Sequence, residues 1–64
     1  MRLTEFWSRM NGRFGPAYAD SMARDQVLAP LGGRTVVEAL AAGEDARVVW
    51  QAVCEVFEVP VRER

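Results

Sequence analysis

The chain has 64 residues, of which eight are basic and nine acidic, so its net charge is −1. A chain of this length forms one domain that buries only about 60% of the surface its unfolded form exposes. Half of the residues are apolar, which argues against a disordered tail, while the balanced charge argues against a nucleic-acid or membrane footprint and the single cysteine excludes an internal disulfide.

The amino-terminal segment shows one apolar stripe at helical spacing. Its members stand three, four and seven residues apart, as they do on one face of a helix. They are Leu3, Phe6, Trp7, Met10 and Phe14. Thr4 is the predicted N-cap of this helix. Gly15 followed by Pro16 predicts its end and the start of the next helix, because glycine suits a helix end and proline a first helical position.

A second helix is predicted from residue 16 to about residue 28. Its apolar side chains cover a broad arc, and Asp20 and Arg24 stand four residues apart outside this arc, where they can pair. The arc consists of Tyr18, Ala19, Met22, Ala23 and Val27. Gln26 also falls inside it. A buried polar side chain needs a hydrogen-bond partner, so either Gln26 bonds to a loop backbone or the helix ends before it.

The next segment, residues 29–33, combines a proline with two glycines and predicts a break in helical structure. Thr35 followed three residues later by Glu38 matches the capping box, in which each side chain bonds to the backbone N–H of the other residue. This pattern predicts a short helix that Gly43 ends.

A fourth helix is predicted to begin at Asp45, a favourable N-cap residue, and to be stopped by Pro60. Its apolar stripe is Ala46, Val49, Trp50, Val53 and Phe57, and its other side carries Arg47, Gln51, Glu55 and Glu58. The valine-rich run at 56–59 has the composition of a strand, but a lone strand would have nothing to pair with, so a helix is preferred. Residues 61–64 are predicted to fray.

These elements predict an all-α fold, a compact bundle of three to four short helices in a single domain spanning residues 1–64. The first and last helices are expected to pack together through side chains of both apolar stripes. The expected contacts are Trp7, Met10, Phe14, Trp50, Val53 and Phe57.

Several ordered runs of the chain resemble a known family. They include MRLTEFW at 1–7, FG at 14–15, YADS at 18–21, ARD at 23–25, VL at 27–28, LGGRTV at 31–36, EAL at 38–40, VW at 49–50, AVC at 52–54, Phe57 and VP at 59–60. Over nearly its whole length the chain is similar to the actinobacterial domain-of-unknown-function family 3046. The resemblance implies a compact helical protein, often encoded close to the recombinase RecA and its regulator, and hence a role near DNA repair or recombination. It implies no specific activity.

The chain lacks the parts that most catalytic schemes require. It has no histidine and no lysine, so neither Ser8 nor Ser21 has a base to activate it, and the usual zinc ligand sets cannot form. Cys54 lies at the edge of the fourth apolar stripe, where a free cysteine behaves as a small hydrophobe, and core packing is predicted for it. We therefore predict a protein that is not an enzyme, with no metal, no cofactor and no evident small-molecule substrate.

The turn at residues 32–35 and two pairs of acidic residues could bind ligands, but each also has a purely structural explanation. The turn at residues 32–35 precedes a helix and could cradle a phosphate on backbone N–H groups, but it lacks the length and the lysine of a P-loop. The acid pairs, Glu44 with Asp45 and Glu55 with Glu58, suit a helix entrance and a solvated helix face. A plain turn and solvated charges are the stronger interpretations.

All eight basic residues are arginines, and four of them form a candidate interaction surface. They are Arg9, Arg13, Arg24 and Arg34. This surface is either a set of solvated helix faces or a docking patch for an acidic protein surface, for which the planar guanidinium group is well suited.

DNA binding by a helix-turn-helix is the alternative function. The small, glycine and aliphatic residues of that motif would be Ala39, Gly43 and Val49, with the fourth helix as reader. Arg47 and Gln51 are the candidate base contacts. However, residues 44–58 carry one arginine against four acids, a net charge of −3 that opposes contact with phosphates. We therefore do not expect nucleic acid as the partner.

The prediction that remains is a non-enzymatic protein-interaction or regulatory module, bound to a partner protein or to a second copy of itself. The amino-terminal residues lack the apolar core of a signal peptide, and no apolar run approaches the roughly 18 residues of a membrane span. The expected location is therefore the cytoplasm, without a membrane as partner.

Overall fold

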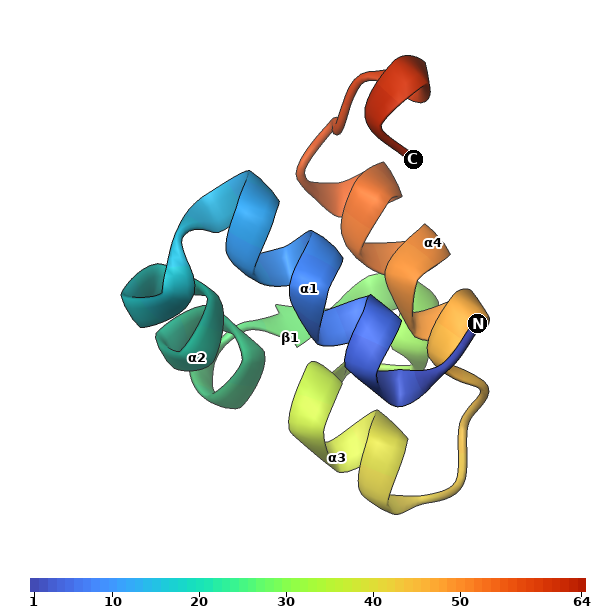
Figure 1. Cartoon of the computed structure of the whole chain (residues 1–64). Helices are drawn as coiled ribbons and strands as arrows, with labels where there is room; N and C mark the ends of the chain where they lie inside the picture. Colours follow the sequence, from blue (N-terminus) through green and yellow to red (C-terminus); the bar gives the residue numbers. More distant parts are fainter.

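The computed structural model describes all 64 residues and contains four α-helices, a two-stranded sheet and two 3₁₀ turns (Figure 1). The helices are α1 (Leu3–Phe14), α2 (Pro16–Asp25), α3 (Val36–Ala41) and α4 (Ala46–Val56). The strands are β1 (Val27–Leu28) and β2 (Arg34–Thr35), and the turns are η1 (Ala29–Leu31) and η2 (Val61–Glu63). The molecule is a mostly helical single domain with four helices, as predicted, but it is not purely α-helical, because the residues on either side of the predicted break pair as two short strands.

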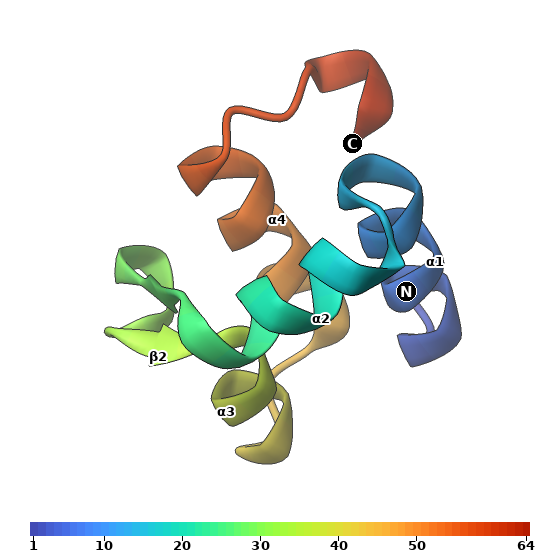
Figure 2. The same cartoon turned by 90° about the vertical axis from the view of Figure 1, so that its left-hand side faces the viewer.

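The predicted first stripe lies on α1, but the helix starts earlier than expected. Arg2 is the N-cap residue and Thr4 lies inside the first turn, so the predicted Thr4 cap is wrong. At the other end Gly15 has a φ of 85°, which glycine adopts without the steric penalty of a side chain. Pro16 then opens α2, as predicted. This sharp connection lays α2 beside α1 (Figures 1 and 2).

The second helix ends at Asp25 rather than near residue 28. Gln26 is its extended, exposed C-cap, so the early helix end is the correct alternative. β1 follows and pairs antiparallel with β2, with Val27 opposite Thr35. Val27 is 59% exposed, although the helical arc had placed it inside. Residues 29–33 form the connection between the strands, which confirms the predicted break in helical structure.

The starts of α3 and α4 confirm the two caps predicted for them. The Thr35 hydroxyl accepts from the Glu38 N–H at 3.1 Å, and the Glu38 carboxylate accepts from the Thr35 N–H at 2.9 Å. At the start of α4 the Asp45 carboxylate accepts from the Arg47 N–H at 2.8 Å. Each cap satisfies backbone donors that a helix leaves free in its first turn.

Both of these helices end in a Schellman motif, in which a residue with positive φ turns the chain back on the last helical turn. In α3 this residue is Gly43, with a φ of 91°, so its predicted role is confirmed. In α4 it is Glu58, with a φ of 53°, and the N–H of Val59 donates to the Cys54 carbonyl at 3.0 Å. This turn, rather than Pro60 as predicted, ends α4.

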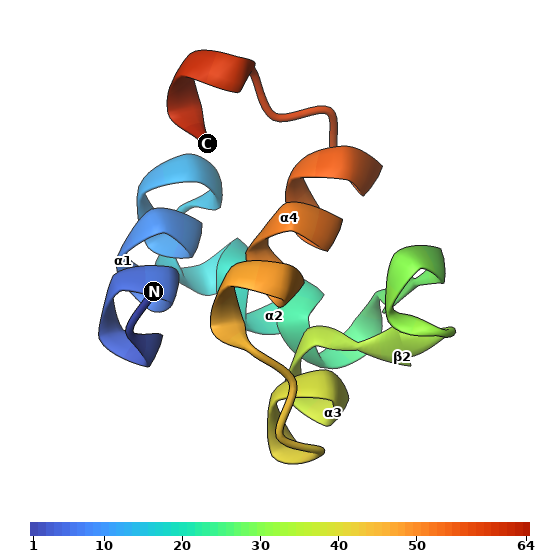
Figure 3. The same cartoon turned by 90° about the vertical axis from the view of Figure 1, so that its right-hand side faces the viewer.

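The tail folds back over the molecule, which differs from the frayed end predicted for residues 61–64. η2 carries the chain from α4 over the end of α1 (Figures 2 and 3). There a Glu63 carboxylate oxygen lies 3.6 Å from the guanidinium group of Arg13. No strand forms at 56–59, as predicted.

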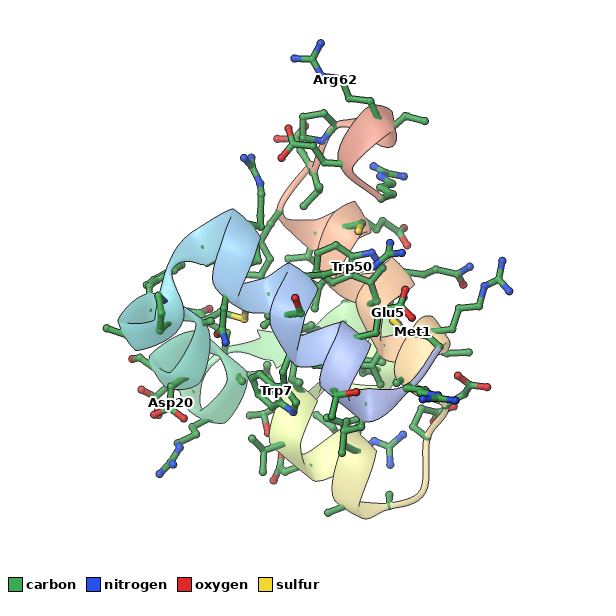
Figure 4. All side chains as sticks on the ribbon, in the orientation of Figure 1. Met1, Glu5, Trp7, Asp20, Trp50 and Arg62 are labelled. Carbon is green, nitrogen blue, oxygen red and sulfur yellow. The ribbon has the colours of Figure 1, made fainter.

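The core joins the first and last helices, as predicted, but through a different central contact. The rings of Phe6 and Trp50 pack edge to face with 6.2 Å between their centroids, and those of Phe14 and Phe57 do so with 5.4 Å between their centroids. Phe6 was absent from the predicted contacts. Trp7, which was among them, is half-buried against Phe6 and lies on the side of α1 that faces α3 (Figure 4).

Candidate binding groove between the first and last helices

An open groove of about 760 Å³ runs beside the contact between α1 and α4. Its first wall comprises Glu5 and Arg9, which stand one helical turn apart on α1, and Met1, which precedes the helix. The opposite wall consists of Arg47, Trp50, Gln51, Cys54 and Glu55 of α4, and Arg64 from the tail completes the lining. Figure 3 views the molecule from this side, and Figure 4 shows Met1, Glu5 and Trp50 on it.

Arg64 is held in the groove by its main chain and by its side chain. Its main-chain oxygen accepts hydrogen bonds from the guanidinium group of Arg9 and from the indole N–H of Trp50, the latter at 3.4 Å. Its own guanidinium group donates to the carbonyl of Val59 at 2.8 Å and to that of Cys54 at 3.5 Å. The groove therefore already holds one peptide segment, the tail of this chain.

Cys54 lies in the α4 wall and is only 1% exposed, which confirms its predicted core packing. Burial raises the pKa of its thiol above the ordinary 9.0, and the positive charges of Arg64 and Arg9 oppose this shift without cancelling it. At neutral pH the side chain is therefore a protonated thiol, which is a poor nucleophile.

The four arginines predicted as a basic surface lie on α1, α2 and β2, and each is paired with a carboxylate of its own. The pairs are Arg9 with Glu5 at 2.9 Å, Arg13 with Glu63 at 3.6 Å, Arg24 with Asp20 at 3.3 Å and Arg34 with Glu44 at 3.2 Å. The pairing of Asp20 with Arg24 is as predicted. Among the four arginines, Arg9 is the one that lines the groove.

The structure does bring together Arg47 and Gln51, the residues of the DNA-binding alternative. Both are exposed and stand one helical turn apart on the α4 wall. The Arg47 guanidinium group forms no salt bridge within the chain. Glu55 continues the same line, so positive and negative charges share this wall.

The other candidate features have local structural roles. At the 32–35 turn the N–H groups of Gly32, Gly33 and Thr35 donate to acceptors within the chain. Glu44 pairs with Arg34, and Asp45 caps α4. No group of three or more histidine, cysteine or acidic side chains is placed to hold a metal ion. No helix is both long enough and apolar enough to cross a membrane.

Arg47, Gln51 and Glu55 lie together on the polar side of α4, as predicted, but nothing in the sequence indicates that they face Glu5 and Arg9 of α1. That depends on how α1 and α4 cross, which helical periodicity does not encode. Trp50 and Arg64 were missed as groove residues. The available signal was chemical: the indole N–H of a buried tryptophan requires an acceptor, here the Arg64 main-chain oxygen.

Comparisons with known proteins address the identity of the chain. No curated protein and no solved structure matches it. The family described as "Protein of unknown function (DUF3046)" matches residues 1–62, a range that includes both helical walls of the groove. The match confirms the resemblance seen in the sequence. The chain therefore belongs to this family of unknown function.

Proposed function

We propose that this protein is a non-enzymatic interaction module that binds a segment of a partner protein in the groove between α1 and α4. One observation carries the proposal: the groove holds the tail of its own chain through hydrogen bonds that side-chain N–H groups donate to main-chain oxygens. Donors that bind one peptide segment in this way can bind another of similar chemistry.

The composition of the groove supports this proposal. Methionine and arginine are enriched at protein interfaces, and the groove walls present Met1, Arg9 and Arg47. Arg47 adds an unpaired guanidinium group, and Gln51 adds an exposed amide beside it. A partner can bind the Arg47 guanidinium group and the Gln51 amide without breaking any ion pair inside the chain.

The non-enzymatic part of the proposal rests on the chemistry of the same residues. No histidine or lysine exists in the chain to act as a base, and burial raises the pKa of the Cys54 thiol. A reducing, cytoplasmic location agrees with a free thiol. A connection to recombination rests on the gene neighbourhood that the family resemblance implies.

DNA binding through α4 is the weaker alternative. Arg47 and Gln51 are exposed, as base contacts must be. The same groove, however, presents the carboxylates of Glu5 and Glu55, which would meet the phosphate backbone. Since phosphate contacts supply most of the affinity of DNA-binding proteins, these charges favour a protein partner.

Photo-crosslinking in the source cell tests the proposal. A photoreactive amino acid replaces Gln51 in the groove and, as the matched control, Ser21, an exposed polar residue on α2. We expect a protein adduct from position 51 and none from position 21, with a lower yield when Arg47→Ala is added. An adduct of two 7.2 kDa chains would identify the partner as a second copy.

Equal yields from the two positions, or no adduct from position 51, would overturn the proposal. An adduct that nuclease digestion removes would instead support the DNA-binding alternative.

A further inference from the structure

The guanidinium group of Arg64 occupies a site whose acceptor atoms belong to the body of the fold. Its Nε donates to the Val59 carbonyl at 2.8 Å, and one of its terminal nitrogens donates to the Cys54 carbonyl at 3.5 Å. Cys54 is a buried residue of α4. Val59 is 1% exposed, and its N–H is tied to the Cys54 carbonyl at 3.0 Å. The burial of both residues therefore keeps the two carbonyls in place when the residues after Val59 move away.

Two donors hold the main chain of the same residue. The guanidinium group of Arg9 on α1 and the indole N–H of Trp50 on α4 both donate to the main-chain oxygen of Arg64. Trp50 is 3% exposed, so its N–H requires an acceptor inside the groove. The site thus offers two acceptors to a guanidinium group and two donors to the main-chain oxygen of the residue that carries it.

The charges of the groove walls balance when Arg64 is left out, but they are unevenly placed. The walls then carry Arg9 and Arg47 against Glu5 and Glu55. Arg9 is paired with Glu5 at 2.9 Å. Arg47 stands eight residues before Glu55, which is about 12 Å along the helix axis. Neither positive charge of the walls therefore neutralises the end of α4.

The end of α4 is the negative part of the emptied groove. The carbonyls of a last helical turn carry the negative end of the helix dipole, and Glu55 lies in that turn. The last turn of α4 contains no basic residue, so a cation at this place has to come from outside the helix, as the Arg64 guanidinium group does. A guanidinium group suits two separate carbonyls because its N–H groups point in fixed, different directions.

Building on the proposed function, we infer that the groove binds an arginine-containing segment of the partner protein. The guanidinium group of that arginine donates to the carbonyls of Cys54 and Val59, and its main-chain oxygen accepts from Arg9 and Trp50. Arg64 is then an internal competitor that the partner displaces.

The tail uses only part of the groove, which favours a different protein over a second copy of the tail as the occupant. The exposed side chains of Arg47 and Gln51 form no hydrogen bond with the tail. Outside the groove the tail is held by the pair of Arg13 with Glu63, which spans 3.6 Å with both side chains more than a third exposed and so contributes little stability. A partner segment that continues from the arginine site toward Arg47 gains contacts that the tail does not make.

A titration followed by proton–nitrogen correlation spectra tests this inference, because the two tryptophans provide a probe and its control. The indole N–H of Trp50 lies at the arginine site, whereas Trp7 lies on the α3 side of α1 (Figure 4). The ligands are the blocked peptide Ala-Ala-Arg-Ala-Ala-Ala and two matched peptides, one with lysine in place of arginine and one with citrulline, which has nearly the same shape but no charge. We expect the arginine peptide to shift the Trp50 indole signal saturably and to leave that of Trp7 unchanged. The citrulline peptide should bind about tenfold more weakly, the effect of losing a charge-assisted hydrogen bond, and the lysine peptide should lie between the two.

Two arginines of the tail give a matched pair that tests the competition. Arg64→Ala empties the guanidinium site, whereas Arg62→Ala removes the same charge from an exposed side chain that forms no ion pair and points away from the molecule (Figure 4). We expect Arg64→Ala to strengthen binding of the arginine peptide by up to about tenfold and Arg62→Ala to leave it unchanged. An unshifted Trp7 indole signal shows in each case that the variant is folded.

Several results would overturn the inference. Equal binding of the lysine or citrulline peptide would show that a guanidinium group is not what the groove recognises, and no shift of Trp50 in either the wild type or Arg64→Ala would remove the site. Equal effects of Arg64→Ala and Arg62→Ala would overturn the role of Arg64 as competitor. A Trp50 signal that moves with protein concentration in the absence of peptide would assign the site to the tail of a second copy. The crosslinking from position 51 decides the proposed function separately, since it does not depend on the chemistry of the partner.

Discussion

Cys54 illustrates how one side chain can belong to the core and to the groove at once. Its position on α4 puts it beside the apolar stripe, which is why core packing could be predicted from the sequence. The proximity of Arg9 and Arg64 could not be predicted, because these residues come from the opposite helix and from the tail. Burial and the two arginines act on the thiol in opposite directions, and burial has the larger effect.

The raised pKa of Cys54 predicts a pH dependence of stability. The folded protein keeps the thiol proton at pH values at which the unfolded chain, with a pKa near 9.0, has lost it. This contribution to stability is therefore complete below that pKa and is lost as the pH rises through and above it. Urea unfolding followed by tryptophan fluorescence should show the free energy of unfolding of the wild type falling in this range relative to that of Cys54→Ala. Parallel pH profiles of the two proteins would contradict the prediction.

The boundaries of helices and strands could be predicted from the sequence where they depend on interactions between residues close together in the chain. The caps at Thr35 and Asp45 were predictable because a cap involves residues two or three positions apart. The Thr4 cap failed because nothing in the local sequence prevents the helix from starting earlier, at Leu3. Two strands of two residues each are too short for an alternating pattern, so the β1–β2 pair left no readable signal.

The two threonines give a matched test of helix capping. Thr35→Ala removes the hydroxyl that accepts the Glu38 N–H at 3.1 Å and should lower the free energy of unfolding by about 1 kcal/mol. Thr4→Ala makes the same change inside the first turn of α1, where alanine has the higher helix propensity, and should leave stability unchanged or slightly higher. Chemical denaturation of both variants measures the difference. Similar losses from the two would argue against the observed start of α1.

The whole molecule depends on the contact between its first and last helices. A 64-residue domain has a total stability of only about 3 to 10 kcal/mol. The Phe6–Trp50 contact closes the core and also sets the two walls of the groove side by side. The sequence predicts that these helices meet, but not that they do so through Phe6. Helical spacing shows which side chains share the apolar stripe, whereas the angle at which α1 and α4 cross determines which of them touch the other helix.

Two positions of the α1 stripe test this selection. Phe6 is fully buried, and Phe6→Ala should cost about 3 to 5 kcal/mol, enough to unfold much of the protein at room temperature. Leu3 belongs to the same stripe but is 51% exposed, so Leu3→Ala should cost much less. Circular dichroism during thermal unfolding measures both. A melting temperature lowered equally by the two variants would contradict the observed packing of α1.

The turn at Glu58 makes the end of α4 the place where the helix opens most easily. A residue other than glycine in the left-handed conformation carries a penalty of about 1 to 2 kcal/mol, which the equivalent turn at Gly43 avoids. Unwinding the last turn of α4 releases this strain, so local opening requires less free energy here than at the end of α3. The opening also frees the tail, because Glu58 lies where the tail leaves the helix. Thermal fluctuations of the helix end and access to the groove are thus mechanically linked.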